Sequence, residues 1–407
     1  MSTQPLHANH STPTTLLLLI IFVTLAAAFV AAPPAHAQIP LGTVTPGDPS
    51  TCYSGTGSEW YAGMTCRGLI INCSNVDANV AGIAVTIGYV TQSASPKGTI
   101  VFFTGGAGTQ GTLGTSGNEF ANAYVSSYMI VYVEWESAWE TSSSTASERN
   151  ILSAACRPAT LLAWINGSSI THPSGAMCAQ GKSAGSAAIA YSMSWYGADS
   201  YLTNVELLAG PVLSEINEGC TSGAPTVTMC SGLSTDPSCY STYKTSGGWS
   251  TSAAYTSNDA SGINAWAGVS DCGTSSGSEL TRLQEMSIVG GAYGTVTPKY
   301  IFSTTTKRHG WVCAGPNTNY YMGSTDCPGF SSGCPNNSSP QGWYWYEQAG
   351  NSDSNLVVTG TNACKGDGAA PNLYYSEAEG IEGGFDPTFP TMSETAEIES
   401  DMNSKCL

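Results

Sequence analysis

The stretch Cys178-Ala-Gln-Gly-Lys-Ser-Ala-Gly-Ser-Ala187 decides how the rest of this 407-residue sequence is interpreted. It contains the pattern Gly181-x-Ser183-x-Gly185, with apolar residues before it and a run of small residues after it. The two glycines allow a sharp turn between a strand and a helix, and such a turn lifts the serine hydroxyl above the edge of a sheet. In a chain with 46 glycines the pattern alone is weak, so its surroundings determine its meaning.

Buried strands and helices alternate on both sides of this turn. Apolar runs of strand length occur at 99–103, 129–133, 175–180 and 205–208. Helical spacing is found within 146–165, and a helix is expected over 184–196, ended by Gly197. This alternation is typical of the α/β class, with a mostly parallel sheet and helices on both faces.

The alternation is interrupted twice after Cys220. Residues 221–277 and 310–339 are rich in Ser, Thr, Gly and Cys without a sustained period, so we expect two irregular, disulfide-tied insertions, the first of them a cap. Outside them the pattern resumes, with a helix over 278–289 and with strands near 299–303 and 355–359. The aromatic run 343–346 is expected to pack in the core.

The amino-terminal segment has the composition of an export signal. Residues 1–37 contain no Lys, Arg, Asp or Glu, and they hold the apolar run 16–32 followed by Ala35-His36-Ala37. This pattern predicts a signal peptide cleaved before Gln38, with an uncleaved membrane anchor as the alternative. In both cases residues 38–407 lie outside the cytoplasm. We expect an exposed lead-in at 38–58 and one α/β domain over 59–407.

Cysteine usage agrees with export. All 14 cysteines follow residue 37, and an even number in an exported chain predicts disulfides. Metal binding is not expected, because paired Cys-x-x-Cys spacing is absent and only His172 and His309 remain after residue 37.

The charge balance excludes one class of partner. The net charge is -17, with 10% of residues charged, and such a surface repels phosphate backbones. We therefore predict no nucleic-acid partner, and no membrane span once the signal is removed. The oligomeric state stays open.

Three segments together resemble the α/β-hydrolase superfamily, particularly its secreted, cysteine-rich, esterase-like members. They are Phe103-Thr-Gly-Gly-Ala-Gly108, the turn 181–185 and Val205-Glu-Leu-Leu-Ala-Gly-Pro211, and the likeness is good over about 95–215. The resemblance implies hydrolysis of small or polymeric esters through an acyl-enzyme on Ser183, without a cofactor. It also implies an oxyanion hole made by the backbone amide of Ala184 and that of Gly106 or Ala107.

A serine nucleophile needs a proton acceptor. His172 precedes Ser183 by 11 residues, which places it at the opposite edge of the sheet, about 20 Å or more away. His309 follows the expected strand at 299–303, so we predict it at the same edge as Ser183 and assign it as the general base.

The sequence departs from the family pattern at the carboxyl end. Members usually carry the histidine after the last strand, whereas no histidine follows His309. The orienting acid is assigned to Asp326, beside Cys327 in the second insertion, with Asp271 and Asp367 as alternatives. If no triad is complete, the chain is a catalytically inactive extracellular binding protein. A hydrolase with paired carboxylates is a more distant alternative, because no acidic pair stands out.

One basic residue lies inside the motif itself. Lys182 precedes Ser183 directly, and its side chain is expected to be solvated at the rim of the site.

Overall fold

The computed structural model divides the chain into Met1–Ala37 and Gln38–Leu407, and the residues that it describes belong to the second unit. The described residues are 38–48, 54–55, 58–59, 61–109, 120–142, 145–208, 210–221, 226–229, 249–252, 254–255, 257–291, 309–313, 341–342, 344–345, 373–376, 399–400 and 402–407. The predicted signal peptide, the strands expected at 299–303 and 355–359, Asp326 and Asp367 lie outside them.

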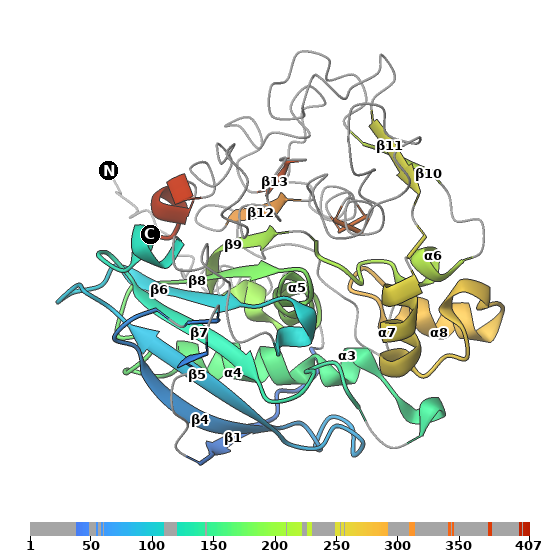
Figure 1. Cartoon of the computed structure of the whole chain (residues 1–407), viewed down its shortest axis with the longest axis horizontal. Helices are drawn as coiled ribbons and strands as arrows, with labels where there is room; N and C mark the ends of the chain where they lie inside the picture. Colours follow the sequence, from blue (N-terminus) through green and yellow to red (C-terminus); the bar gives the residue numbers. More distant parts are fainter. Residues whose placement is uncertain are drawn as a thin grey trace, which may run out of the picture. The chain divides into compact units, whose positions relative to one another are not determined.

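The described part contains a nine-stranded sheet in the order β1-β4-β5-β7-β6-β8-β9-β12-β13 (Figure 1). Its strands are β1 (Thr43–Pro46), β4 (Thr65–Asn72), β5 (Ile83–Val90), β6 (Gly98–Phe103), β7 (Met129–Trp135), β8 (Ala176–Lys182), β9 (Leu202–Leu208), β12 (His309–Cys313) and β13 (Leu373–Ser376). The pairs from β1 to β7 are antiparallel, and those from β7 to β13 are parallel.

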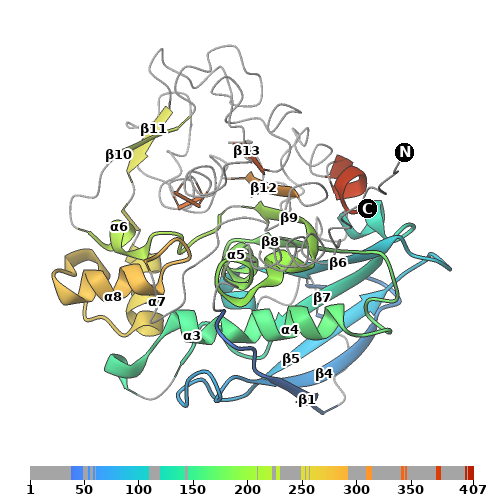
Figure 2. The same ribbon diagram turned by 180° about the vertical axis from the view of Figure 1, so that it is seen from behind.

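Helices cover one face of this sheet. They are α3 (Ile151–Ala154), α4 (Cys156–Asn166) and α5 (Ala184–Tyr196), and Figure 2 shows α4 and α5 in front of the strands. Every residue of α5 is buried, which its small and apolar side chains permit between the sheet and α4. Short 3-10 turns are η1 (Gly106–Gly108), η2 (Ala146–Glu148) and η3 (Ala198–Ser200).

The other face is covered by helical residues 120–124 and 402–405. A disulfide joins Cys178 of β8 to Cys406, across 228 residues of sequence. Helices therefore lie on both faces of a mostly parallel sheet, which confirms the predicted α/β class and gives the strand arrangement of the α/β-hydrolase fold.

The first predicted insertion holds regular elements. They are the hairpin β10 (Thr226–Met229) with β11 (Trp249–Ser252), α7 (Ser257–Ala267) and η6 (Cys272–Thr274). Helix α6 (Ile216–Cys220) precedes the insertion, and α8 (Ser278–Met286) follows it at the place of the helix predicted over 278–289. The disulfide Cys220–Cys272 ties this region together. It is fastened to α5, because Tyr191 Oη donates to Met286 O at 2.6 Å and Trp195 Nε1 donates to Ser287 O at 3.2 Å. A further short hairpin is formed by β2 (Ser54–Gly55) and β3 (Ser58–Glu59).

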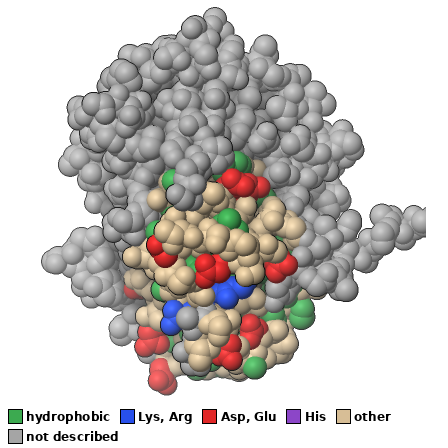
Figure 3. All heavy atoms as spheres, turned by 90° about the vertical axis from the view of Figure 1, so that its right-hand side faces the viewer, with side chains coloured by type: hydrophobic (Ala, Val, Ile, Leu, Met, Phe, Trp, Pro, Cys, Tyr) green, Lys and Arg blue, Asp and Glu red, His purple; other side chains and the backbone are tan. Residues whose placement is uncertain are grey.

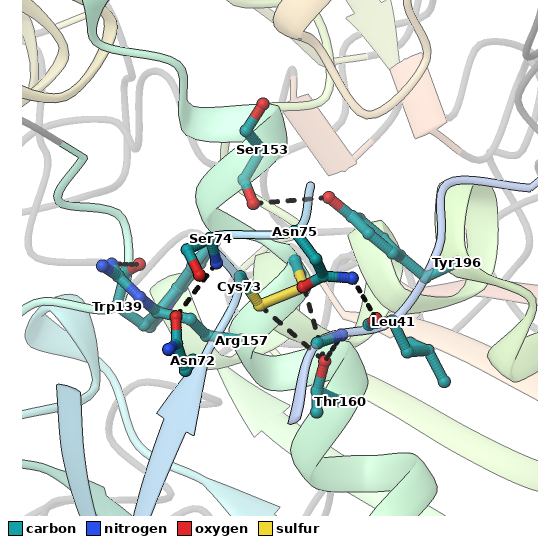
Figure 4. Close-up of a disulfide and its surroundings, with 12 residues drawn as sticks. Leu41, Asn72, Cys73, Ser74, Asn75, Trp139, Ser153, Arg157, Thr160 and Tyr196 are labelled. Carbon is teal, nitrogen blue, oxygen red and sulfur yellow. Dashed lines mark hydrogen bonds between the residues drawn. A yellow bond between two sulfur atoms is a disulfide. The ribbon is translucent and has the colours of Figure 1, made fainter. Parts of the chain in front are cut away.

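A third disulfide, Cys73–Cys156, joins the residue after β4 to the start of α4 (Figure 4). Thr160 lies beside it, and its Oγ1 accepts from the amide of Gly42 at 2.8 Å. The disulfide therefore links the end of β4 to α4, and the hydrogen bond ties Gly42, just before β1, to the same helix.

The face drawn in Figure 3 carries acidic side chains spread among uncharged ones, with basic side chains between them. None of the described helices has the length and apolar character needed to cross a membrane.

Candidate active site

The motif around Ser183 forms the turn between β8 and α5. Ser183 has φ 51° and ψ -116°, a conformation that side-chain-bearing residues rarely adopt. Its side chain makes no hydrogen bond that caps α5, although it occupies the N-cap position, and the residue is partly exposed. The hydroxyl is therefore not used to hold the helix.

The two glycines of the motif are required by close packing. A Cβ at Gly181 would lie 2.5 Å from the carbonyl carbon of Gly185. A Cβ at Gly185 would collide with the carbonyl oxygen of Phe103, the last residue of β6. The sharp turn and the close approach of β6 to α5 both depend on the absence of these side chains.

Three hydrogen bonds hold the backbone of Ser183. Its amide donates to Leu208 O at 2.9 Å, so the turn is tied to the end of β9. Its carbonyl oxygen accepts from the amide of Ala187 at 3.1 Å and from the hydroxyl of Ser186 at 2.5 Å. These bonds maintain the unusual backbone conformation.

The glycine-rich turn after β6 lies against Ser183. A Cβ at Gly105 would be 3.5 Å from the Cβ of Ser183, in ordinary van der Waals contact. Residues 106–108 form η1, in which the amides of Gly108 and Thr109 donate to the carbonyls of Gly105 and Gly106. Gly106 and Ala107 are the first two residues of this turn, and their amides come before the two amides that donate within it. Ala184, the third predicted oxyanion residue, is the first residue of α5.

His172 lies at the far end of the sheet, as predicted. Its Nδ1 is 3.0 Å from the Oγ1 of Thr99, which pairs with Met177 near the start of β8. Burial lowers the pKa of His172 below its ordinary value.

The backbone position of His309 differs from the predicted one. The sequence placed it beyond a strand, at the edge that carries Ser183, whereas it is the first residue of β12. It pairs with Asn204, which in turn pairs with Cys178, five positions before Ser183 in sequence. Lys182 pairs with Leu208, which pairs with Cys313 of β12. His309 therefore lies four residues, or about 13 Å, before the level of Lys182 along β12. The reason is that β12 pairs with β9 from residue 309 onward. The catalytic role of His309 stays a prediction.

The predicted acids have different outcomes. Asp271 caps η6, where its carboxylate accepts from the amide of Gly273 at 3.0 Å and from Thr274 Oγ1 at 2.9 Å. It serves the local structure of the cap region. Asp326 and Asp367 lie outside the described residues.

Sequence analysis missed a buried ionisable pair beside the site. Glu140 follows β7 and is fully buried, and burial raises the pKa of its carboxyl to about 8, with the charge of Arg157 acting in the opposite direction. Burial also lowers the pKa of Arg157 to about 10, so the guanidinium is charged at neutral pH. Glu140 is followed by the polar residues 141–145, so the local sequence gave no signal that its carboxyl would be interior.

Among the residues that the structure describes, no cluster of three or more His, Cys, Asp or Glu side chains is arranged to hold a metal ion.

Several solved structures are similar to this chain. An esterase from Pyrobaculum calidifontis is 13% identical with a TM-score of 0.45, covering 83% of this chain and 85% of its own. Brefeldin A esterase, a bacterial homologue of human hormone-sensitive lipase, is 10% identical with a TM-score of 0.40, covering 100% of this chain and 89% of its own. No family model and no curated protein matches the sequence. Both of these solved structures are esterases.

Proposed function

We propose that this protein is a serine hydrolase that cleaves carboxylic esters through an acyl-enzyme on Ser183. The Ser183 hydroxyl oxygen attacks the ester carbonyl carbon, the bond to the alcohol oxygen breaks, and the alcohol leaves with a proton. Water then attacks the acyl-serine and releases the acid, which restores the hydroxyl. Every atom comes from the ester, water and the serine, so no cofactor is required.

The observation that carries this proposal is the backbone of Ser183. A residue with φ 51° and ψ -116° is strained, and such strain persists when the surrounding structure enforces it. Here it places a partly exposed hydroxyl, not engaged in capping, at the junction of a central parallel strand with a buried helix. This is the local structure that a nucleophilic serine needs.

The neighbouring turn supports the same chemistry. A Cβ at Gly105 would be 3.5 Å from the Cβ of Ser183, and Gly106 and Ala107 are the next residues along the chain, at the start of η1. Together with the amide of Ala184 they are the proposed donors to the oxyanion of the tetrahedral intermediate. Losing one such donor typically lowers turnover by about 10² to 10³.

His309 is the proposed proton acceptor, with Asp326 as its orienting acid. This part of the proposal rests on the scarcity of histidines, because the ring of His172 is bound to Thr99 at the far end of the sheet. The register of β12 does not favour it, since residue 309 starts that strand. The base is therefore tested separately from the nucleophile.

A fluorophosphonate probe tests the nucleophile. We expect covalent labelling of the wild type, loss of labelling in Ser183→Ala, and retention in Ser174→Ala, whose exposed serine bonds to Pro96 O at the other end of β8. An unlabelled wild type would contradict the enzyme and support an extracellular binding protein.

Hydrolysis of a short p-nitrophenyl ester tests the base. We expect His309→Ala to lower kcat by about 10² or more. Near-native turnover in His309→Ala, with none in Ser183→Ala, would remove His309 from the mechanism and leave the nucleophile in place.

We also infer that the protein is exported. The described disulfides Cys73–Cys156, Cys178–Cys406 and Cys220–Cys272 support an oxidising compartment. Amino-terminal sequencing of protein recovered outside the cytoplasm should begin at Gln38. A first residue before Gln38 would contradict the cleavage site.

A further inference from the structure

The loop after β7 is unusually buried for a connecting segment. Trp139 and Glu140 are both fully buried, and Ser142 is 1% exposed. Loops normally run over the surface, because their backbone polar groups need partners. A buried loop requires internal hydrogen bonds to its carbonyls.

Arg157 of α4 supplies those bonds. Its Nη1 donates to Trp139 O at 2.9 Å and also to Thr141 O, while its Nη2 donates to Ala81 O at 2.7 Å. Figure 4 shows the guanidinium turned towards the backbone of Trp139. Arg157 is 2% exposed, so these charge-assisted bonds form away from water. A planar fork of donors suits several carbonyls at once, which a lysine cannot reproduce.

The loop in turn contacts the glycine-rich turn beside Ser183. A Cβ at Gly108, whose φ is 78°, would lie 2.5 Å from Cδ1 of Trp135 and 3.2 Å from Cδ1 of Trp139. The Trp139 ring also meets the ring of Tyr191 of α5 edge-on, with 6.1 Å between centroids. The indole of Trp139 thus lies beside Gly108 at the end of η1, next to the nearer ring of Trp135, and it packs on Tyr191 of the helix that follows Ser183.

We propose that Arg157 is a positioning residue for the oxyanion hole. It fixes the carbonyls of residues 139 and 141, this holds Trp139 against Gly108, and η1 is thereby kept at a set distance from Ser183. This inference rests on the proposed function. It adds that the reaction requires Arg157 and Trp139, although neither touches the substrate or the reacting atoms.

Displacement of η1 should affect kcat more than KM. Backbone amides fixed before the reaction stabilise negative charge that develops only in the transition state. Displacing η1 therefore weakens transition-state binding more than substrate binding, so kcat falls while KM changes little.

The experiment compares Arg157→Lys with Arg149→Lys. Arg149 is a matched control, because it also donates to a backbone carbonyl, Ala265 O at 2.7 Å, but in the cap region. We expect Arg157→Lys to lower kcat by about 10-fold to 100-fold, with KM within about twofold. The inhibition constant of a trifluoromethyl ketone, which forms an oxyanion on the serine, should rise by a similar factor. Hydrogen exchange of amides 104–109 should become faster. Arg149→Lys should match the wild type in all of these measurements.

Trp139→Phe is a second, milder variant in case Arg157→Lys does not fold. It retains the backbone carbonyl that Arg157 binds and removes part of the indole beside Gly108. We expect the same fall in kcat and the same faster exchange at 104–109. Wild-type kcat together with wild-type exchange in either folded variant would overturn the proposal.

Failure of the proposed function gives a different result. In that case the wild type is not labelled by the fluorophosphonate, whereas hydrogen exchange still reports whether Arg157 holds residues 104–109. Faster exchange in Arg157→Lys alone would support the mechanical link, and unchanged exchange would contradict it.

Discussion

Gly210 lies so close to the hydroxyl of Ser186 that a Cβ there would overlap it. The same hydroxyl donates to the carbonyl oxygen of Ser183 at 2.5 Å. The segment after β9 is therefore packed directly on a hydrogen bond that holds the turn at Ser183.

This contact predicts the effect of Gly210→Ala. The added methyl group must displace Ser186, so we expect a loss of about 1 to 3 kcal/mol in the free energy of unfolding, typical of overpacking. The rate of fluorophosphonate labelling should also fall. The control is Gly167→Ala, where the nearest atom to a Cβ is Ala163 O at 3.5 Å and the backbone is helical. Equal labelling rates in the two variants would contradict the coupling.

The strain at Ser183 predicts a difference in stability between two variants that lack the hydroxyl. Glycine adopts positive φ without a steric penalty, whereas alanine has a Cβ and still pays that penalty. We expect Ser183→Gly to be more stable than Ser183→Ala by about 1 kcal/mol, measured by urea unfolding, although glycine is the more flexible residue when unfolded. An alanine variant at least as stable as the glycine variant would show that the turn is not strained.

The burial of Glu140 predicts a pH-dependent stability. Burial raises its pKa from the ordinary 4.5 to about 8 in the folded protein, so the folded state binds an extra proton between these pH values. Stability should therefore fall as pH rises through that window, by up to about 1.4 kcal/mol per pH unit. In Glu140→Gln this contribution disappears, and the loss of unfolding free energy between about pH 5 and about pH 7.5 should shrink by about 3 kcal/mol.

Glu136→Gln is the matched control for this measurement. Glu136 lies in the same loop and is exposed, so its removal should leave the pH dependence as in the wild type. An unchanged slope in Glu140→Gln would mean that its carboxyl is ionised in the folded protein.

The disulfides predict a ranking of stabilities. Cys178–Cys406 closes a sequence separation of 228 residues and Cys220–Cys272 one of 52. In the chain-entropy description, removing the longer link costs about 1.3 kcal/mol more. Unfolding of the two double Cys→Ala variants in denaturant measures this difference, and the opposite ranking would show that local packing dominates.

Local signals predicted the parts of the fold that depend on local sequence. Residues 184–196 form α5 as expected, because Ser183 and Gly197 delimit it through their own conformations, with φ of 51° and 80°. The central strands β6, β7, β8 and β9 were predicted for a similar reason, since buried parallel strands are continuous apolar runs.

Contacts between distant segments were not predictable in the same way. His309 was expected beyond a strand, but its position depends on which residues of β12 pair with β9, and single-sequence periodicity does not fix that register. Arg157 reads as an ordinary helical cation, although its partners are carbonyls at positions 81, 139 and 141. Only the tertiary structure brings these groups together.

The bond between Cys178 and Cys406 also constrains how the protein is made. When Cys178 has been synthesised, its partner is still 228 residues away, while Cys52, Cys66, Cys73 and Cys156 are already present. The thiolate of Cys178 on β8 can meanwhile attack disulfides that these earlier cysteines have formed. The yield of correctly paired protein should then depend on how fast wrong disulfides are rearranged. We therefore expect a higher yield from production hosts that supply a disulfide isomerase than from hosts that supply only an oxidant.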